Sequence, residues 1–326
     1  MSSPASTLPL IDLQPDTASF RDEVLAGLQS TPKTISSKFL YDERGSKLFE
    51  AICELDEYYP TRTEIGIMEQ HVEAMAEALG PEVLLVEYGS GSSWKTRILL
   101  DHLTDPAGYV PVDISKEHLM QAAGELSDDY PNLPVLPVCA DYTDEVRLPD
   151  PGRSVRRRVV YFPGSTIGNF VTDRARDFLA HIRSLVAPDG GLLIGVDLQK
   201  DASLLHAAYD DAEGVTAEFN KNLLRRINRE LDADFDLDRF EHEARYNAEE
   251  GRVEMHLVST EAQQVTVAGV PIDFAEGETI CTEYSCKYTL DGFADLAASA
   301  GLAVEQVWTD DDALFSIQYC TVAEAG

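Results

Sequence analysis

Basic residues are scarce in this chain. Its 326 residues include 26 Lys and Arg against 58 Asp and Glu, which gives a formal net charge of −32, and only 8 of the basic residues are Lys. A surface this acidic repels nucleic-acid phosphates and anionic membranes, so we expect neither as a partner. The 44% content of hydrophobic residues argues against disorder. The length favours about two domains.

Cysteine and histidine are also few, and their spacing is uninformative. The five cysteines form an odd set without a C-x-x-C pair, which is typical of buried thiols in a reducing compartment. The seven histidines show no H-x-x-x-H or H-E-x-x-H spacing, so we expect no metal site. The N-terminus lacks a signal-peptide pattern, and no apolar run approaches the ~18 residues of a membrane helix. We therefore expect a cytoplasmic protein, and in the absence of an apolar surface stripe a monomer.

Short apolar runs alternate with amphipathic segments in the middle of the chain. Strand-like runs occupy residues 83–88, 109–112, 133–139, 158–162 and 191–198. Helical periodicity occupies residues 63–79, 96–103, 116–126 and 173–185. This alternation predicts an α/β fold, with a parallel, Rossmann-like sheet that is covered by helices on both faces.

The regular alternation of strand-like and helical segments is absent outside this region. We predict helices at 16–30, 215–231 and 291–300, acidic turns at 233–247, strands at 253–259, 264–270 and 279–288, and a C-terminal hairpin of strands 302–308 and 314–322. The pattern predicts a nucleotide-type domain formed by residues 62–200 and 286–326. Residues 1–61 and 201–285 would form a second, substrate-binding lobe.

A glycine pair follows the first of the strand-like runs. Gly89 and Gly91 lie in VEYGSGSSWKT, where glycines allow a tight turn and the close approach of a ligand. The dinucleotide fingerprint needs a third glycine, and Trp94 stands in its place, which weakens the case for a nicotinamide cofactor. A G-x-G after a strand can also be only a turn.

Acidic residues end the next two strand-like runs. A site for S-adenosylmethionine needs a carboxylate for the ribose hydroxyls, which Asp113 can supply, while Asp141 can accept from the adenine amino group with Tyr142 beside the ring. Each aspartate could instead cap a helix. Because the carboxyl ends of parallel strands form the ligand-binding edge of such sheets, the three features together favour S-adenosylmethionine as the methyl donor.

The segment PGSTIGNF follows the fourth strand-like run. In small-molecule methyltransferases this position faces the reactive methyl group. Asn169 offers both a donor and an acceptor, which suits the amine and carboxylate of an amino acid. The alternative is a turn that precedes the next helix.

Several longer segments resemble one family, the L-histidine Nα-methyltransferases of ergothioneine biosynthesis. The resemblance covers residues 31 to 319. It is carried by TPKTISSKFLYDERGSKLFE, EYYPTRTE, VEYGSGSSWKTR, FPGSTIGNF, AYDDAEGVTAEFNKNLLRRINRELDADFDLDRFEH, RVEMHL and TEYSCKY. It implies a class I methyltransferase fold and the transfer of three methyl groups from S-adenosylmethionine to the α-amine of L-histidine, which gives hercynine.

The resemblance also implies roles for individual residues. On the cofactor side it implies Gly89, Lys95 at the methionine carboxylate, Asp113, Asp141 and Tyr142. On the substrate side it implies Tyr58, Asn169 and Tyr209 at the α-carboxylate and amine, Glu283 and Ser285 at the imidazole, Met255 along the ring, and Tyr41, with Asn169, near the reacting end. No histidine is positioned as a base, so we hypothesise catalysis by orientation, with water taking the amine proton.

Two residues depart from the family pattern, and other functions remain open. Trp94 is bulky for its loop, and Tyr284 stands where a smaller aliphatic residue is expected; in a strand its side chain should point away from Glu283 and Ser285. The alternatives are a paralogue that methylates another aromatic amino acid such as tryptophan, a non-catalytic S-adenosylmethionine-binding protein, and an NAD-dependent oxidoreductase. Met255 and Glu283 count against the first of these.

Overall fold

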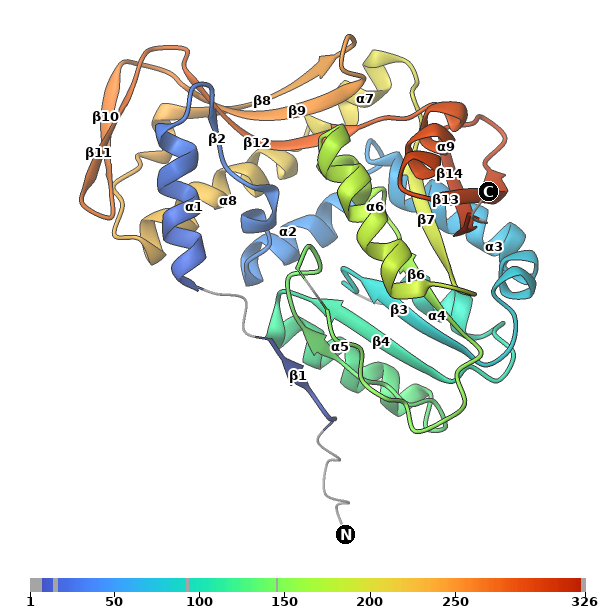
Figure 1. Cartoon of the computed structure of the whole chain (residues 1–326). Helices are drawn as coiled ribbons and strands as arrows, with labels where there is room; N and C mark the ends of the chain where they lie inside the picture. The colour runs from blue at the N-terminus through green and yellow to red at the C-terminus, as the bar shows by residue number, and fades with distance from the viewer. Residues whose placement is uncertain (1–7, 14–16, 92–93, 145, 324–326) are drawn as a thin grey trace.

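A large, mostly parallel sheet forms the centre of the molecule (Figure 1). The computed structural model describes residues 8–13, 17–91, 94–144 and 146–323. Among the described strands of this sheet, only the seventh in sheet order is reversed, and it pairs antiparallel with both the sixth and the eighth. The strands, in sheet order, are β1 (Ile11–Asp12), β5 (Val138–Cys139), β4 (Gly108–Asp113), β3 (Val83–Tyr88), β6 (Arg157–Phe162), β7 (Gly191–Asp197), β14 (Phe315–Val322) and β13 (Leu302–Thr309).

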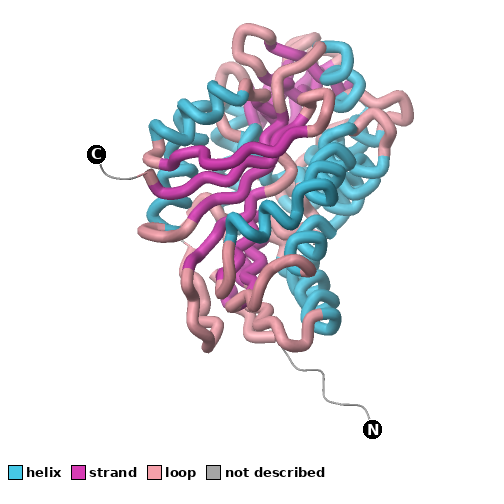
Figure 2. The backbone as a smooth tube through the Cα atoms, turned by 90° about the vertical axis from the view of Figure 1, so that its right-hand side faces the viewer, coloured by secondary structure: helices cyan, strands magenta, loops and turns pink. Residues whose placement is uncertain are grey.

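Helices cover both faces of this sheet, as predicted (Figure 2). Side chains of β3 alternate between the two apolar layers: Val83 and Leu85 join one, and Leu84, Val86 and Tyr88 join the other. The first layer is completed by α3 (Tyr59–Leu79), α4 (Trp94–Leu100) and α5 (Lys116–Asp129), and the second by α6 (Thr172–Val186) and α9 (Leu290–Ser299). The nearly continuous apolar sequence of β3 follows from this two-sided burial.

A second, smaller sheet lies beside the first and has its own apolar core. Its strands are β2 (Lys33–Thr34), β12 (Thr279–Cys286), β9 (Arg252–Ser259) and β8 (Phe240–Asn247), and the hairpin β10 (Gln263–Val267) and β11 (Val270–Phe274) extends from it (Figure 1). The helices of this part are α1 (Thr17–Gln29), α2 (Glu43–Glu54), α7 (Ala202–Tyr209) and α8 (Val215–Glu230), with the 3-10 turns η1 (Ser37–Leu40) and η3 (Leu237–Arg239).

The two sheets meet at a third 3-10 turn, η2 (Thr166–Asn169), which follows β6 and packs on β12. Gly168 makes this approach possible, because a Cβ atom there would lie 2.8 Å from the carbonyl oxygen of Cys286. The turn therefore brings the carboxyl end of the large sheet to the strand that carries Glu283 and Ser285.

Several local predictions were wrong. Residues 233–247 are not only turns, since β8 occupies Phe240–Asn247; its alternating charges fit a strand with one buried face. The strand expected at 264–270 is interrupted by a hairpin turn at Ala268 and Gly269, whose φ angles are +49° and +80°. The strand expected at 133–139 shrinks to Val138–Cys139, because two prolines in this segment lack N–H donors. Helices α2 and α7 were not predicted.

The division of the chain into 62–200 with 286–326 and 1–61 with 201–285 stays a prediction. The smaller sheet is built from strands of the second set of residues, apart from the last residue of β12. Strand β1 belongs to that set by number but pairs with β5 at the edge of the large sheet. Helix α3 crosses the boundary at residue 62.

Candidate active site

The glycine loop lies at the carboxyl end of β3, at the ligand-binding edge of the sheet. Gly89 and Gly91 both have positive φ angles, +73° and +43°, which disfavour any residue with a Cβ. The amide of Gly89 donates to the carbonyl of Val112, and this bond ties the loop to the end of β4. Asp113 ends β4, and its Oδ1 accepts from the amide of Ser115 at 2.9 Å. Burial raises the pKa of Asp113.

Asp141 and Tyr142 follow β5, the next strand along this edge. The Oδ1 atom of Asp141 accepts from the amide and hydroxyl of Thr143, while Oδ2 lies 3.3 Å from Nζ of Lys38. The ring of Tyr142 stacks on that of Tyr88, with centroids 5.5 Å apart. Both predicted residues therefore lie at the expected edge, with Asp141 already engaged by neighbours within the protein. Sequence reasoning had not identified Lys38.

Lys95, in the first turn of α4, pairs with Glu64 of α3. The Glu64 side chain is fully buried, and both of its oxygens also accept from the amide of Gly164, each at 3.0 Å. Gly164 has a φ of +75° and begins the turn that leads to η2. Glu64 thus joins three segments at the carboxyl end of the sheet, and sequence reasoning missed it.

Three of the predicted tyrosines converge on Glu283. The rings of Tyr58 and Tyr209 meet edge to face at 6.2 Å. Tyr41 packs between Phe49 and Phe219, and its pKa is raised well above its ordinary value by burial and then by the nearby Glu283 carboxylate. The pKa of Tyr58 is also raised well above its ordinary value, first by burial and then by the neighbouring Tyr209. One cluster therefore contains all four side chains.

Strand β12 presents the predicted imidazole-binding pair on one face. Glu283 lies opposite Met255 of β9 in the strand register, and Met255 is almost fully buried. Tyr284 points to the other face, as predicted, where the guanidinium of Arg252 lies over its ring at 4.2 Å. Ser285 follows on the face of Glu283, and its Oγ lies 2.7 Å from the hydroxyl of Tyr209.

Glu283 is a half-buried residue whose carboxylate has unused capacity for hydrogen bonds. Its Oε2 is buried and finds no hydrogen-bond partner within the described part of the chain. Burial raises the pKa of Glu283 to about 7, against the opposing influence of the Lys287 ammonium. An acceptor left without a donor at such a position is costly unless a ligand supplies the donor.

Asn169 is the last residue of η2 and is half-buried. The turn holds it at the carboxyl end of β6, next to β12. The neighbouring Ser165, with a φ of +56°, accepts from the amide of Asp197 at 2.9 Å, which fixes the turn to the end of β7. Asn169 therefore lies where the carboxyl end of the large sheet meets β12, the strand that carries Glu283.

A buried ionic network beneath this cluster was missed by sequence reasoning. Asp197, the last residue of β7, accepts from the hydroxyl of Tyr59 and pairs with both Lys200 and Lys287. The side chains of Asp197 and Lys287 are each only 1% exposed. Lys287 also donates to the Tyr209 hydroxyl at 2.9 Å and to Ser285 Oγ at 2.6 Å. The network therefore touches two predicted substrate residues.

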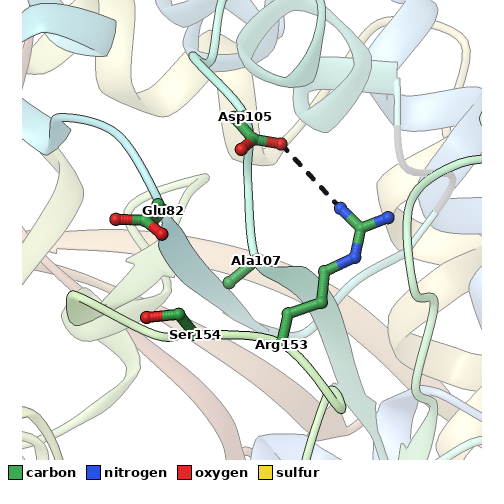
Figure 3. Close-up of a pocket in the computed structure, with 5 residues that line it drawn as sticks. All are labelled: Glu82, Asp105, Ala107, Arg153 and Ser154. Atoms are coloured by element: carbon green, nitrogen blue, oxygen red, sulfur yellow. Dashed lines mark ion pairs between the residues drawn. The ribbon is translucent and has the colours of Figure 1, made fainter.

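One surface pocket lies at the opposite end of the strands. It has a volume of about 340 Å³ and is lined by Glu82, Asp105, Ala107, Arg153 and Ser154, with Arg153 facing Asp105 at 3.9 Å (Figure 3). These residues precede β3, β4 and β6, whereas sheets of this type bind ligands at the carboxyl ends of their strands. The pocket is therefore separate from the candidate site.

Membrane-spanning helices and clusters of metal-binding side chains are both absent from the described residues. Among residues 8–13, 17–91, 94–144 and 146–323, none of the helices combines the length and the apolar character needed to cross a bilayer. In the same ranges no group of three or more His, Cys, Asp or Glu side chains is arranged to hold a metal ion.

The sheet order, the glycine loop and the acidic strand ends define a Rossmann-like methyltransferase. The family model for histidine-specific, S-adenosylmethionine-dependent methyltransferases matches residues 20–322, and the chain belongs to this family. It is 43% identical over 296 residues to the histidine N-alpha-methyltransferase of Mycolicibacterium smegmatis, covering 89% of this chain and 91% of the relative. The corresponding Mycobacterium tuberculosis protein is 41% identical, with 91% and 93% covered. Ergothioneine biosynthesis protein 1 of Neurospora crassa is 32% identical over 85% of this chain and 32% of its own length.

Proposed function

We propose that this protein transfers three methyl groups from S-adenosylmethionine to the α-amine of L-histidine and forms hercynine, the first step of ergothioneine biosynthesis. The observation that carries the proposal is the unpartnered Oε2 of Glu283, which is buried opposite Met255 and beside the Tyr209–Ser285 pair. A neutral imidazole has one N–H and one acceptor nitrogen, and this face of β12 offers a carboxylate and a hydroxyl. The two mycobacterial relatives, which are histidine N-alpha-methyltransferases by name, support the same substrate, and the fungal relative supports the pathway.

The residues at the carboxyl edge of the sheet fit S-adenosylmethionine. Gly89 and Gly91 leave two positions of the loop without a side chain, Asp113 suits ribose hydroxyls, and an ammonium such as Lys95 suits a carboxylate. Asp141 and Tyr142 would serve the adenine; Asp141 would share its carboxylate with Lys38. When bound, this cosubstrate supplies a methyl group on a sulfonium, an electrophile that needs no metal.

Orientation of the amine is the main task of the protein in this reaction. Tyr58, Asn169 and Tyr209 would hold the α-carboxylate and amine, and Tyr41 would line the reacting end. Burial raises the pKa values of Tyr41 and Tyr58, so both stay protonated and act as neutral hydrogen-bonding groups. The amine proton then leaves to water before each transfer, and positioning accounts for most of the rate enhancement.

The direct test is a competition experiment. The protein is incubated with S-adenosylmethionine and an equimolar mixture of the twenty amino acids, and the products are weighed by mass spectrometry. We expect histidine to gain the mass of three methyl-for-hydrogen replacements, with one- and two-methyl species appearing first. Methylation of tryptophan instead would select the paralogue, and cofactor binding without any product would select a non-catalytic binding protein.

The affinity for histidine should fall in acid because of Glu283. Its pKa of about 7 in the free protein means that the carboxylate is increasingly protonated below pH 7 and ceases to accept an imidazole N–H. We expect KM for histidine to rise up to about tenfold per pH unit below pH 7, in initial-rate measurements from pH 5.5 to 8.5. Glu283→Gln is the matched control, because its remaining pH dependence belongs to histidine itself; an unchanged profile in this variant would contradict the assignment.

A further inference from the structure

Lys287 is a buried ammonium whose three N–H groups all have partners. Nζ lies 2.7 Å from Asp197 Oδ2, 2.9 Å from the Tyr209 hydroxyl and 2.6 Å from Ser285 Oγ. An ammonium has three donors and no acceptor, so both hydroxyl oxygens must accept from it. The salt bridge to Asp197 holds Nζ in place, and Lys200 and the Tyr59 hydroxyl help to fix Asp197 in turn.

This arrangement limits what the two hydroxyl groups can do. Tyr209 and Ser285 lie 2.7 Å apart, so one of them donates its hydrogen to the other. Two hydroxyl hydrogens are available and one is used within the pair. The pair can therefore point only one O–H outward, toward a ligand.

The charge of Lys287 also decides which ligand atom can approach. A positive charge 2.6 Å behind Ser285 Oγ opposes a second N–H, above all one from a cationic ring. It favours a lone pair instead, to which the remaining O–H donates. On the same face of β12, Glu283 presents a carboxylate. In its ionised form this group accepts hydrogen bonds and has none to donate.

We infer that Lys287 is a specificity-determining positioning residue, which makes the Ser285–Tyr209 pair a hydrogen-bond donor and so selects a ring with one N–H and one unprotonated nitrogen. The inference rests on the proposed function, since it takes the imidazole of histidine as that ring. Asp197 acts through Lys287 by holding its ammonium. If Ser285 gives its hydrogen to the ring, Tyr209 donates to Ser285 and keeps one lone pair, which can accept from the substrate amine but cannot bind its carboxylate.

The test uses the full chain and two histidine analogues, 3-(pyrrol-2-yl)alanine and 3-(pyrrol-3-yl)alanine. Each keeps one ring N–H and has carbon at the other nitrogen position. The wild-type protein should prefer histidine over both. In Lys287→Met and in Ser285→Ala, KM for histidine should rise roughly 10- to 100-fold with kcat changed much less, and the preference in kcat/KM should shrink by a similar factor.

The double variant Lys287→Met/Ser285→Ala separates positioning from a structural role. If Lys287 acts through Ser285, the double variant should be no worse with histidine than the worse single variant; additive losses, or an unchanged preference for histidine in Lys287→Met, would overturn the inference. If Lys287→Met does not fold, Lys287→Met with Asp197→Asn removes both charges and is scored in the same way. Wild-type protein without activity on histidine would instead refute the proposed function.

Discussion

Glu283→Ala should raise KM for histidine by roughly 30- to 1000-fold, because removing one partner of a buried, charge-assisted hydrogen bond costs about 2–4 kcal/mol. The carboxylate lies on the substrate-facing side of β12, and its free oxygen is the acceptor that the ring N–H requires. KM for S-adenosylmethionine should change less than threefold or so, since the cofactor residues lie at the ends of β3, β4 and β5. Steady-state kinetics with each substrate varied in turn measures both constants.

A measurement of stability distinguishes the loss of histidine binding in Glu283 variants from misfolding. Because the pKa of Glu283 is raised from 4.5 to about 7, the folded protein binds more protons than the unfolded chain between these values, and stability falls as pH rises through that window. At pH 8 the buried carboxylate lowers the free energy of unfolding by about 3 kcal/mol. Glu283→Gln, which keeps the shape, should therefore melt no lower than the wild type at pH 8, while its histidine KM should rise less than that of Glu283→Ala, because the amide oxygen still accepts but carries no charge.

A matched surface variant completes this experiment. Glu241→Ala removes an exposed carboxylate from β8, two strands away from Glu283 in the same sheet. It should leave both KM values and the melting temperature unchanged. Equal effects of Glu283→Ala on the two KM values would contradict the assignment of Glu283 to the imidazole.

The parts of the fold that depend on local periodicity could be predicted from the sequence. The β3 strand was predicted with its correct limits because six consecutive residues are buried between two helical layers. Strand β8 was missed because charged residues occupy every second position along it, on the more exposed face. A segment so rich in charged residues is also typical of turns. Helix α2 was missed within an aromatic and glycine-rich tract, although Asp42 caps it by accepting from the amide of Gly45.

The residues of the candidate site likewise fall into those that the sequence predicts and those that it does not. Residues carried by a motif, such as Gly89 and Glu283, were predicted, and the structure brings them to two adjoining regions. Glu64 and Lys287 were missed because their roles depend on distant partners: Gly164 follows Glu64 by 100 residues, and Tyr209 precedes Lys287 by 78. One signal was available, since Glu64 falls on the apolar face of its predicted helix, three and four residues before Ile67 and Met68.

The junction formed by Glu64 should contribute strongly to stability. Its carboxylate is the partner of Lys95, whose side chain is 19% exposed, and the acceptor for the amide of Gly164. Gly195 of β7 leaves the room for it, because a Cβ there would lie 2.2 Å from Glu64 Oε1. Glu64→Ala would therefore leave an ammonium and an amide without partners, next to a cavity that an alanine cannot fill.

We expect Glu64→Ala to lower the free energy of unfolding by about 3–5 kcal/mol, measured by urea denaturation without ligands. Glu64→Gln keeps the volume and an acceptor for the Gly164 amide, so its loss should be smaller. Glu69→Ala, an exposed position on the same helix, should change stability by less than about 0.5 kcal/mol. If Glu64→Ala proved as stable as Glu69→Ala, the junction would have no energetic role.

Glu64→Ala should also weaken binding of S-adenosylmethionine, because Glu64 anchors both Lys95 and the turn that begins at Gly164. Isothermal titration calorimetry at a temperature well below the melting transition should show a Kd raised by at least about tenfold, equivalent to one charge-assisted hydrogen bond lost. Histidine KM, measured at saturating cofactor, should rise less, since Glu283 and Ser285 are held by β12 instead. A Kd equal to that of Glu69→Ala would mean that Lys95 and the Gly164 turn keep their positions without the buried carboxylate.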